Sequence, residues 1–578
     1  MSDFLFTARR REPGALRRQL EAYLAPVADF AEHHGDWGSL AVALGPHDPP
    51  EVVVEDGGWL SVLVGEPVVR IAPEPPGLSW RGSRRRLLHG LLREDRERDW
   101  SAHLDGHFAA LAVDTGSGMG WVLTDLFAFV PVFLSTDGEG GLVIGTHVDA
   151  VARAAGRGRD VDPVSATDFA ATLTCTFPYT LFRGVEQALP GTARRFGRDG
   201  WQGSGHTFWR PAERPGAFAT VRDAAAALRA AVERDVRTAC DGLPEVGLLL
   251  SGGEDSRAVL GAVPPGPEVR AFVYADWESR EVRVARAVAR AYGVALTVGW
   301  RGPSHYLDGF ETAASMVGGH HLFMDVHGYG FHQRLGIREL PVVLGGLSSD
   351  SLLKGEYAVP RATGPVSVPR APMLREELLR EVEARRTAFR DRLAELRPGS
   401  ADEWLVLWPL CMRKHGGNVD GNRRLFRAHE VYHSTAVLEV AAAVPAAWKL
   451  HRRLFHLAMR PFLARTRWVP HSKARYPAFG RWGNLLLAPG LAAARGARAL
   501  LTGQLRARHG PWPRFSAVAG SAAAEQWRRE HPLLDTPLRG IFVPAPAAEV
   551  EAGVERWHPL RRLILLQLTH LAMKAQSE

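Results

Sequence analysis

The sequence predicts an α/β protein whose first part is built from antiparallel hairpins and whose second part is a doubly wound parallel sheet. Up to residue 210, short alternating segments such as "EVVVEDGGWLSVLVG" are separated by glycine turns, which is typical of antiparallel strands. From residue 211, amphipathic helical segments alternate with short buried strands, an order that produces a parallel sheet covered by helices. We therefore expect two domains, residues 1–210 and 211–578, with a mostly helical C-terminal part from about residue 370.

The individual elements follow in order along the chain. Residues 107–126 and 131–147 each carry two apolar runs around a glycine-rich turn, so each is expected to form antiparallel strands joined as a hairpin. Residues 210–220 contain two prolines and a glycine and are expected to form a linker. Residues 220–240 repeat apolar side chains at helical spacing, and residues 246–250, "VGLLL", are expected to be a short buried strand.

The composition indicates an ordinary soluble globular protein. The chain has 578 residues, of which 46% are hydrophobic and 23% are charged, so it is long enough to bury large cores. No window approaches 18 uncharged apolar residues, and the start "MSDFLFTARRREPG" lacks the apolar run of a secretory signal. The three cysteines lie far apart and fit neither a disulfide framework nor a zinc site. We therefore expect a cytoplasmic protein with no membrane partner.

The chain is basic, with a formal net charge of +8 and an isoelectric point near 9.6, which raises the question of nucleic-acid binding. The arginines, however, are scattered over nearly every segment, and the densest runs, "RGSRRR" and "REDRERD", are short or mixed in sign. Scattered charge is typical of a solvated surface, so we expect no nucleic-acid partner. Only five lysines are present and none precedes Lys354, which makes each lysine a better functional candidate than usual.

The segment "LLLSGGEDSRAVL", residues 248–260, combines the features of an anion-binding turn. The strand is expected to end at Leu250 and the next helix to begin near Asp255. In a doubly wound sheet, ligands bind beyond the carboxyl ends of the strands, over helix N-termini. Glycines let backbone amides approach a phosphate there, and a carboxylate beside a phosphate indicates Mg²⁺ between them. Residue types alone leave an ordinary serine-glycine turn before a helix as an equal alternative.

Two common nucleotide motifs are excluded at this turn. A Walker A loop needs a lysine, none of which precedes Lys354, and the dinucleotide pattern GxGxxG is missing. "SGGEDS" instead resembles the SGGxDS loop of the PP-loop ATP pyrophosphatases, which cleave ATP to AMP and pyrophosphate. Further segments, in order, resemble the asparagine synthetase B family and its β-lactam synthetase and lasso peptide cyclase branch: "GHFAALAVDTGSGMGWVLTDLFAFVPVF", "FPYTLFRGVEQALPG", "LGGLSSDSLLKGEY" and "WVPHSKARYPAFG".

The resemblance implies roles for the residues that match the family's motifs. It implies an Ntn-hydrolase-like α+β sandwich for the first domain and a PP-loop, adenine-nucleotide α-hydrolase-like synthetase domain for the second. Asp255 and Asp350 would bind magnesium, and the ammonium of Lys473 would neutralise the leaving pyrophosphate, which makes these three the catalytic residues. A surface lysine is the other interpretation of Lys473. The residues implied to bind ATP are Ser251, Gly252, Gly253, Asp255, Ser256, Val273, Gly346 and Ser349.

The N-terminal domain departs from the family where a glutaminase needs its nucleophile. The family's amidohydrolases use an N-terminal cysteine and an Asn-Gly oxyanion site, whereas here the first cysteine is Cys175 and the first asparagine is Asn418. Removal of Met1 would expose Ser2, but a serine nucleophile would be poorly served without the oxyanion asparagine. We therefore expect no glutamine hydrolysis, and a domain kept as a scaffold or as a surface that holds a substrate or partner.

A second departure concerns the groups that take a proton from the attacking amine. Family members carry Glu or Tyr three residues before the second-motif aspartate, where this chain has Leu347. The partner glutamate of the family falls on Arg427, with His429 or Glu430 as substitutes if the register slips. Glu254, inside the SGGEDS loop, is expected to be an exposed residue at the start of a helix, where the helix dipole favours it.

These features predict an AMP-forming, ATP- and Mg²⁺-dependent ligase that adenylates a carboxylate and passes the acyl group to an amine without glutamine. The expected substrate is a small molecule or peptide that carries a carboxylate and an amine, as in macrolactam or natural-product amide formation, with pathway proteins as further partners. A sulfur-inserting tRNA-modifying PP-loop protein is disfavoured, because three dispersed cysteines supply no evident sulfur relay. A drifted synthetase homologue that only binds a peptide or a nucleotide remains as the non-enzymatic alternative.

Overall fold

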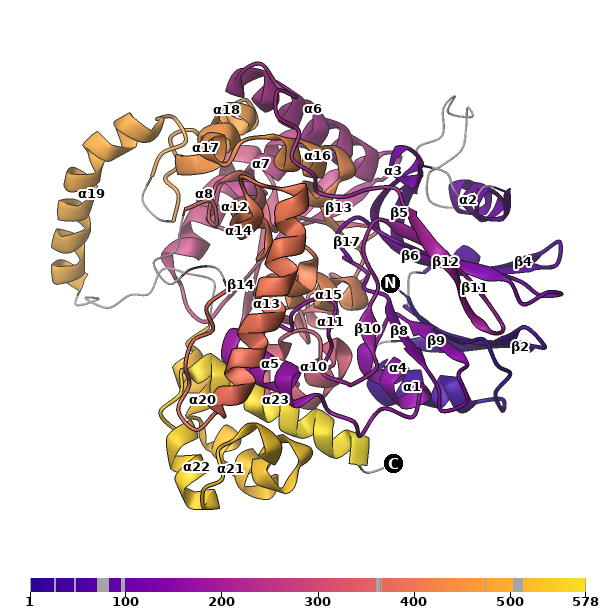
Figure 1. Ribbon diagram of the computed structural model, residues 1–578. Coiled ribbons are helices and arrows are strands. Elements are labelled where there is room, and N and C mark those ends of the chain that lie inside the picture. Colours follow the sequence, from indigo (N-terminus) through magenta and orange to yellow (C-terminus); the bar gives the residue numbers. More distant parts are fainter. Residues whose placement is uncertain are drawn as a thin grey trace.

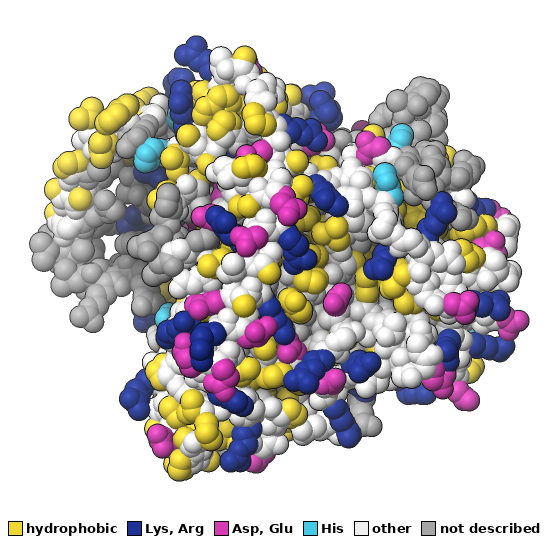
Figure 2. All heavy atoms as spheres, in the orientation of Figure 1, with side chains coloured by type: hydrophobic (Ala, Val, Ile, Leu, Met, Phe, Trp, Pro, Cys, Tyr) yellow, Lys and Arg dark blue, Asp and Glu magenta, His cyan; other side chains and the backbone are white. Residues whose placement is uncertain are grey.

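The computed structural model describes residues 2–24, 28–45, 48–69, 83–94, 99–359, 364, 366–472, 475–502 and 513–576. In Figure 1 the antiparallel strands of the N-terminal part lie on one side of the molecule, and most of the helices lie on the other. Among the described residues, no helix combines the length and apolarity that a membrane crossing needs. On the face in Figure 2, basic side chains are spread among acidic ones and do not gather in one patch.

The N-terminal part consists of antiparallel sheets, as the sequence predicts. Its strands are β1 Asp3–Thr7, β2 Asp29–Gly35, β3 Gly38–Leu44, β4 Val53–Asp56, β5 Trp59–Val69, β6 Leu104–Asp114, β7 Gly120–Thr124, β8 Phe133–Thr136, β9 Leu142–Gly145, β10 Glu186–Gln187, β11 Thr192–Gly197 and β12 Gly200–Thr207. Within the described residues they form two six-stranded sheets, ordered β10-β8-β9-β1-β3-β2 and β12-β11-β7-β6-β5-β4. Phe4 and Phe6 join the core between the sheets, whereas Leu5, on the opposite face of β1, packs with Leu16 of α1 (Ala15–Leu24).

The second part contains a parallel sheet, which confirms the predicted change of architecture. Its strands are β13 Glu245–Leu249, β14 Glu268–Ala275, β15 Ala295–Trp300, β16 Val343–Gly345 and β17 Ala428–Glu430. Their order is β15-β14-β13-β16-β17, and every neighbouring pair is parallel. The chain therefore builds outward from β13 to β15 and then returns to the other side of β13. This reversal creates a switch point between β13 and β16, where the carboxyl ends of the strands leave room for a ligand.

Helices cover this sheet and form most of the chain beyond residue 370, where the described strand is β17. Helix α6 begins at Val221, where the Thr220 side chain accepts a hydrogen bond from the Asp223 amide and Asp223 bonds back, forming a capping box. The helices of the N-terminal part besides α1 are α2 Ser83–Glu94, α3 Trp100–His103, α4 Val148–Ala154 and α5 Pro163–Thr172. Those of the second part are α6 Val221–Cys240, α7 Asp255–Ala262, α8 Arg280–Tyr292, α9 His305–Asp308, α10 Phe310–Val317, α11 Phe331–Arg334, α12 Ser349–Leu353, α13 Glu376–Leu396, α14 Ala401–Trp404, α15 Gly417–Leu425, α16 Thr435–Ala443, α17 Ala446–Lys449, α18 Arg453–Met459, α19 Arg481–Thr502, α20 Phe515–Ala519, α21 Ala522–Glu530, α22 Ala547–Val554 and α23 Pro559–Gln576.

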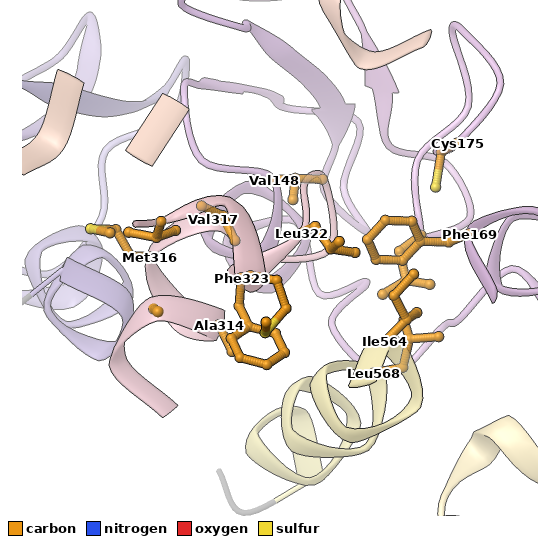
Figure 3. Close-up of a cluster of buried hydrophobic side chains, with 14 of the residues drawn as sticks. Val148, Phe169, Cys175, Ala314, Met316, Val317, Leu322, Phe323, Ile564 and Leu568 are labelled. Carbon is orange, nitrogen blue, oxygen red and sulfur yellow. The ribbon is translucent and has the colours of Figure 1, made fainter. Parts of the chain in front are cut away.

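Hydrophobic clusters extend across the two parts. The C-terminal helix α23 supplies Ile564 and Leu568, which are fully buried beside Phe169 of α5 and Leu322 and Phe323 of the second part (Figure 3). A helix from the chain end therefore packs against elements of both parts. The chain between β12 and α6, residues 208–220, has no regular helix or strand, in keeping with the predicted linker, while the predicted domain boundary at residue 210 stays a prediction.

A buried ionic cluster also joins the two parts at the N-terminus. Asp3 of β1 accepts hydrogen bonds from Arg423 and Arg424 of α15, and Asp420 pairs with the same two guanidinium groups. Burial alone would raise the pKa of Asp3, but the two guanidinium groups outweigh it and hold that pKa well below its usual range. Ser2, which precedes this cluster, is fully buried, and its carbonyl oxygen accepts a hydrogen bond from Arg423 (3.3 Å).

Candidate active site

A cavity of about 500 Å³ lies at the switch point of the parallel sheet. Its lining includes the loop after β13, the end of β14 and the turn after β16. Most of the residues that the sequence implies for ATP binding therefore lie around one space: Ser251, Gly253, Asp255, Ser256, Val273, Gly346 and Ser349. Their role in binding ATP stays a prediction. Another cavity, of about 660 Å³, lies among α21, α22 and α23 and is lined by residues between 525 and 569.

The loop between β13 and α7 is shaped by its own hydroxyl groups. The Ser251 amide donates to Ser256 Oγ (2.9 Å), and the Gly253 amide donates to Ser251 Oγ (3.1 Å). The two hydroxyls lie 3.2 Å apart and both line the cavity. The loop thus presents small polar side chains at the N-terminus of α7, where the helix dipole favours a negative ligand.

Gly252 has a packing role that the motif alone does not show. Its amide donates to Glu281 Oε1 (2.6 Å), and its carbonyl oxygen accepts from the Ser472 amide (3.1 Å). A Cβ atom at this position would lie 3.0 Å from the Glu281 carboxylate and 3.1 Å from the Ser472 side chain. Glycine therefore lets the loop, α8 and the segment around Ser472 meet closely. In this arrangement the Gly252 amide donates its hydrogen bond to a carboxylate and not to a phosphate.

The two aspartates predicted to bind magnesium lie close together, with Lys354 between them. The Lys354 ammonium donates to Asp350 Oδ1 (2.8 Å) and to Asp255 Oδ1. Its side chain is 4% exposed and lies over the ring of Phe455, 4.4 Å from the ring centroid. Burial raises the pKa of Asp255; the Lys354 ammonium opposes this change and the Asp350 carboxylate reinforces it.

As a metal site, this pair of carboxylates does not fit in its present arrangement. Mg²⁺ is commonly held by one or two carboxylates together with waters, so the oxygen donors themselves are suitable. The ammonium of Lys354, however, takes the position between them. No group of three His, Cys, Asp or Glu side chains suited to a metal ion occurs among the residues that the structure describes.

Glu254 is buried and paired, so the expectation of an exposed helix-start residue was wrong. Its carboxylate accepts a hydrogen bond from Arg452 Nη2 (2.6 Å), and the residue is 3% exposed. Burial would raise the pKa of Glu254, but the Arg452 guanidinium outweighs it and lowers that pKa to about 2. His451 and Arg452 both have φ in the left-handed region, at 55° and 66°. This costly backbone conformation brings Arg452 over the loop, an arrangement that needs the folded chain around it.

The opposite wall of the loop depends on Gly346. A Cβ there would lie 3.0 Å from the Ser256 amide nitrogen and 3.2 Å from the Asp255 carbonyl carbon. The turn after β16 can therefore touch the N-terminus of α7 only without a side chain at this position. Ser349, which opens α12, is 1% exposed, and Val273 lines the cavity from β14.

The candidate proton acceptor in the cavity is Glu430, at the end of β17. Its Oε2 accepts a hydrogen bond from the Leu347 amide (2.9 Å), and a Cβ at Gly345 would lie 2.2 Å from the same oxygen. Burial raises the pKa of Glu430 to about 7, against the lowering effect of the Leu347 amide. Arg427, at the position where the resemblance places the family's glutamate, instead pairs with Glu66 of the N-terminal part. It therefore does not take the place of that glutamate.

His429 also lies away from the cavity. Its Nε2 contacts Asp235 Oδ2 of α6 at 2.8 Å. Burial alone would lower the pKa of His429, but the Asp235 carboxylate outweighs it and raises that pKa. Because successive residues of a strand face opposite sides, Glu430 and His429 cannot both reach the cavity. Of the two substitutes that the sequence suggests, Glu430 is the one that lines the cavity, and its role as a base stays a prediction.

Lys473 lies outside the described residues, so its predicted contact with phosphate stays a prediction. The residues before it, His471 and Ser472, line the cavity. Burial lowers the pKa of His471 to about 3, so the ring is neutral at pH 7. Arg280 donates to the Ser472 carbonyl oxygen (2.5 Å), which ties this segment to α8.

Cationic and amide side chains line another part of the cavity. They are Arg413, Lys414, His415, Asn418 and Asn422, from α15 and the turn before it. His415 Nδ1 lies 2.8 Å from the buried carboxylate of Asp325. Burial alone would lower the pKa of His415, but its hydrogen bond to Asp325 raises it. This set suits a ligand with carboxylate or amide groups.

The sequence reasoning missed three residues that shape the site: Lys354, Arg452 and Glu281. For Lys354 a signal existed, because it is the first of only five lysines and lies four residues after Asp350. Arg452 carries no such signal in a chain rich in arginine. Glu281 contacts the loop across 29 residues of sequence, a contact that only the packing of α8 against the loop creates.

Comparisons with known proteins bear on the region that forms this cavity. A family model described as asparagine synthase matches residues 227–469. Comparison with curated protein sequences gives no match. A solved structure described as that of the allosteric regulatory enzyme of purine biosynthesis is similar over 62% of this chain and 76% of its own, with 10% identity and a TM-score of 0.26. For residues 227–469, which include the loop, both aspartates and Glu430, the family match supports the asparagine synthetase family.

Proposed function

We propose that the protein is an ATP-dependent ligase that adenylates a substrate carboxylate, releases AMP and pyrophosphate, and passes the acyl group to an amine. One observation carries the proposal: the SGGEDS loop, Asp350 and the carboxyl group of Glu430 line a single cavity at the switch point. The asparagine synthase match supports an ATP-dependent amidation. Residues 211–578 would be a PP-loop synthetase domain and residues 1–210 an Ntn-hydrolase-like domain, in a protein that works in the cytoplasm.

The loop side of the cavity supports nucleotide binding. The hydroxyls of Ser251 and Ser256 face the N-terminus of α7, where phosphate oxygens are favoured. The edge of β14 at Val273 would contact adenine, and the close turn at Gly346 would contact the ribose. Lys473 would neutralise charge on the leaving pyrophosphate. ATP would enter as its Mg²⁺ complex, which offsets the charge of the phosphates.

The amine side of the reaction would use Glu430. An alkyl ammonium must lose a proton before its nitrogen can attack an acyl adenylate. A general base is most effective when its pKa lies near the working pH, and burial raises the pKa of Glu430 to about 7. The Leu347 amide, which donates to Glu430 Oε2, holds the carboxyl group toward the cavity.

The substrate would be a small molecule or a peptide that carries both a carboxylate and an amine. Arg413 and Lys414 supply positive charge at one part of the cavity, and Asn418 and Asn422 supply amides there. These side chains suit the carboxylate and peptide groups of such a substrate. Amide formation in natural-product or modified-peptide biosynthesis, including macrolactam closure as in lasso peptide cyclases, is the class we favour. Proteins of the same pathway would be further partners.

The N-terminal part would act without glutamine hydrolysis. Ser2 is fully buried, and the ionic cluster of Asp3 with Arg423 and Arg424 lies next to it. Arg423 and Arg424 come from α15, so side chains of the synthetase part fill the space around the first residues of β1. A nucleophile at position 2 would have no access to glutamine in this arrangement.

The alternative function is a drifted synthetase homologue that binds a nucleotide or a peptide without turnover. Two observations favour it: Leu347 cannot accept a proton, and Lys354 holds both aspartates. The carboxyl group of Glu430 in the cavity favours the ligase.

The two functions differ in the products formed from ATP. With its cognate carboxylate, the full-length protein should release AMP and pyrophosphate, measured by nucleotide chromatography and pyrophosphate exchange. Asp255→Asn, Asp350→Asn and Lys473→Met should each lower pyrophosphate release by about 10²-fold or more, because Lys473 would carry positive charge toward the phosphates and the two aspartates hold a cation beside them. Glu233→Gln, which breaks an exposed ion pair on α6, is the matched control. Steady formation of ADP, or binding of ATP without exchange across candidate carboxylates, would overturn the ligase assignment.

A further inference from the structure

Lys354 occupies a position that the proposed chemistry leaves unexplained. Its ammonium donates to one carboxylate oxygen of Asp255 and to one of Asp350, the latter at 2.8 Å. These carboxylates come from two different elements, the first turn of α7 and the first turn of α12. Lys354 immediately follows α12 and connects both at the loop side of the cavity.

The placement of Lys354 is determined by packing along its whole side chain. The side chain is 4% exposed, and its ammonium lies 4.4 Å from the centroid of the Phe455 ring, which favours a cation. The next residue, Gly355, has a φ of +73°, and a Cβ there would lie 3.0 Å from the Lys449 carbonyl carbon. The chain therefore turns sharply against the segment before α18 directly after Lys354. A surface lysine would show none of these constraints.

The charges at this end of the cavity are already paired without a metal ion. Glu254 is neutralised by Arg452, at 2.6 Å. Asp255 and Asp350 share Lys354. Each of these three carboxylates thus contacts a cation, and a divalent cation bound between the aspartates would meet an ammonium at the same place. Like charges at contact distance repel, and although the Asp350 side chain is 59% exposed, the Lys354 ammonium that a metal ion would meet is buried.

We propose that Lys354 is the resident cation of the phosphate end of the cavity and takes the place of a protein-bound divalent metal ion. Asp255 and Asp350 then hold a lysine, and the metal that accompanies ATP is the single divalent ion of the site. The number of metal ions per nucleotide rests on the proposed function, whereas the exclusion of metal from the free protein does not.

Manganese binding tests the inference without any turnover. Full-length, nucleotide-free protein is titrated with Mn²⁺, and free Mn²⁺ is followed by electron paramagnetic resonance. Wild type should bind no Mn²⁺ at the two aspartates, so Asp350→Asn should leave Mn²⁺ binding unchanged. Lys354→Met keeps the length of the side chain but removes the charge, and should raise Mn²⁺ affinity by at least about tenfold, because a like charge has gone. The double variant Lys354→Met/Asp350→Asn should lose the gain.

A second titration counts metal ions beside a bound nucleotide. With a non-cleavable α,β-methylene ATP analogue, wild type should bind one Mn²⁺ per nucleotide and Lys354→Met should bind two. Lys354→Arg keeps the charge and should behave as wild type, and Lys414→Met removes a charge elsewhere in the cavity without creating a site. If Lys354→Met does not fold, as its melting curve would show, the wild-type counts alone decide.

Two results of the Mn²⁺ titrations would contradict the proposed role of Lys354. Nucleotide-free wild type that binds Mn²⁺ through Asp350, or two Mn²⁺ per nucleotide in wild type, would overturn the role of Lys354. Pyrophosphate release is measured separately. If wild type excludes Mn²⁺ as expected but releases no pyrophosphate with any carboxylate, the ligase proposal fails while the inference about Lys354 stands.

Discussion

Replacing Asp3 with asparagine is expected to loosen the contact between the N-terminal part and the parallel-sheet part. Asp3 is 1% exposed and accepts hydrogen bonds from Arg423 Nη2 and Arg424 Nε, both at 2.8 Å. Asp420 pairs with the same guanidinium groups, at 2.9 and 2.6 Å. Two carboxylates thus balance two guanidinium groups inside the protein. Asp3→Asn leaves one buried positive charge without a counter-charge.

The expected loss of stability follows from this burial. Removing one partner of a buried ion pair costs about 3–5 kcal/mol, because the remaining charge stays out of water. For a domain of about 150–250 residues, 1 kcal/mol moves the melting temperature by about 2–4 °C, so the first unfolding transition should fall by about 6 °C or more.

The pH dependence of this effect has a definite sign. The pKa of Asp3 is held below its usual range, and that of Asp420 is lowered to about 2, in each case because the two guanidinium groups outweigh burial. A carboxyl group with a lowered pKa stabilises the fold fully above the unfolded value of about 3.9, and this contribution is lost as the pH falls toward the folded value. The difference in stability between wild type and Asp3→Asn should therefore be full at pH 7 and should decrease as the pH falls below about 3.9.

Scanning calorimetry of the full-length protein measures this difference. The matched control is Glu233→Gln, which breaks an exposed pair with Arg237 (3.0 Å) on the surface of α6. Exposed pairs contribute about 0–1 kcal/mol, so the control should melt close to wild type. A melting temperature of Asp3→Asn within about 2 °C of the control at pH 7 would refute the reasoning, because that shift corresponds to less than a buried pair contributes.

Three further predictions concern the cavity and the N-terminus. In rapid-quench assays, Glu430→Gln should remove the rise of amide formation near pH 7 and leave adenylate formation unchanged; an unaltered pH profile would exclude Glu430 as the base. The same variant should melt at a higher temperature above pH 7, because burial raises the pKa of Glu430 to about 7 and its ionisation costs stability as the pH rises from 4.5. In a coupled glutamate assay, glutamine should yield no glutamate above background, and Ser2→Ala should leave synthesis unchanged, since Ser2 is buried. A glutamine-dependent product lost in Ser2→Ala would contradict this.

The parts of the fold that were predictable from sequence are those with local causes. Alternating apolar residues around glycine turns predict the hairpins that the structure shows as β6–β7 and β8–β9. Helical spacing predicts α6, and a capping box at Thr220 sets its start. A parallel sheet follows from strands that alternate with helices, and this order in turn places the loop of residues 251–256 at a strand end, beside the cavity.

The parts of the site that were not predictable depend on contacts between distant segments. Glu254 looks like an exposed residue at a helix start until Arg452, almost 200 residues later, reaches over it. Lys354 lies four residues from Asp350, yet its contact with Asp255 spans 99 residues and needs β13 and β16 to be neighbours. Such contacts leave no periodic pattern in the sequence, because they arise from the order of strands in the sheet.

The position of Glu430 depends on the pairing of β17 with β16, and it bears on the choice between a ligase and a binding protein. Strand β17 pairs with β16 so that Glu430 lies opposite Gly345 and its neighbour His429 lies opposite Leu344. A side chain at position 345 would collide with the Glu430 carboxylate, and the Leu347 amide donates to that carboxylate. A carboxyl group that lines a cavity and whose pKa is raised by burial is suited to accept a proton from a substrate near pH 7. At position 427, where the resemblance places a carboxylate, this chain has an arginine that pairs with Glu66 of the N-terminal part, and Glu430 three residues later lines the cavity. The placement of Glu430 therefore supports the proposed ligase over the proposed binding protein, because it supplies a carboxyl group where the amine would have to lose a proton.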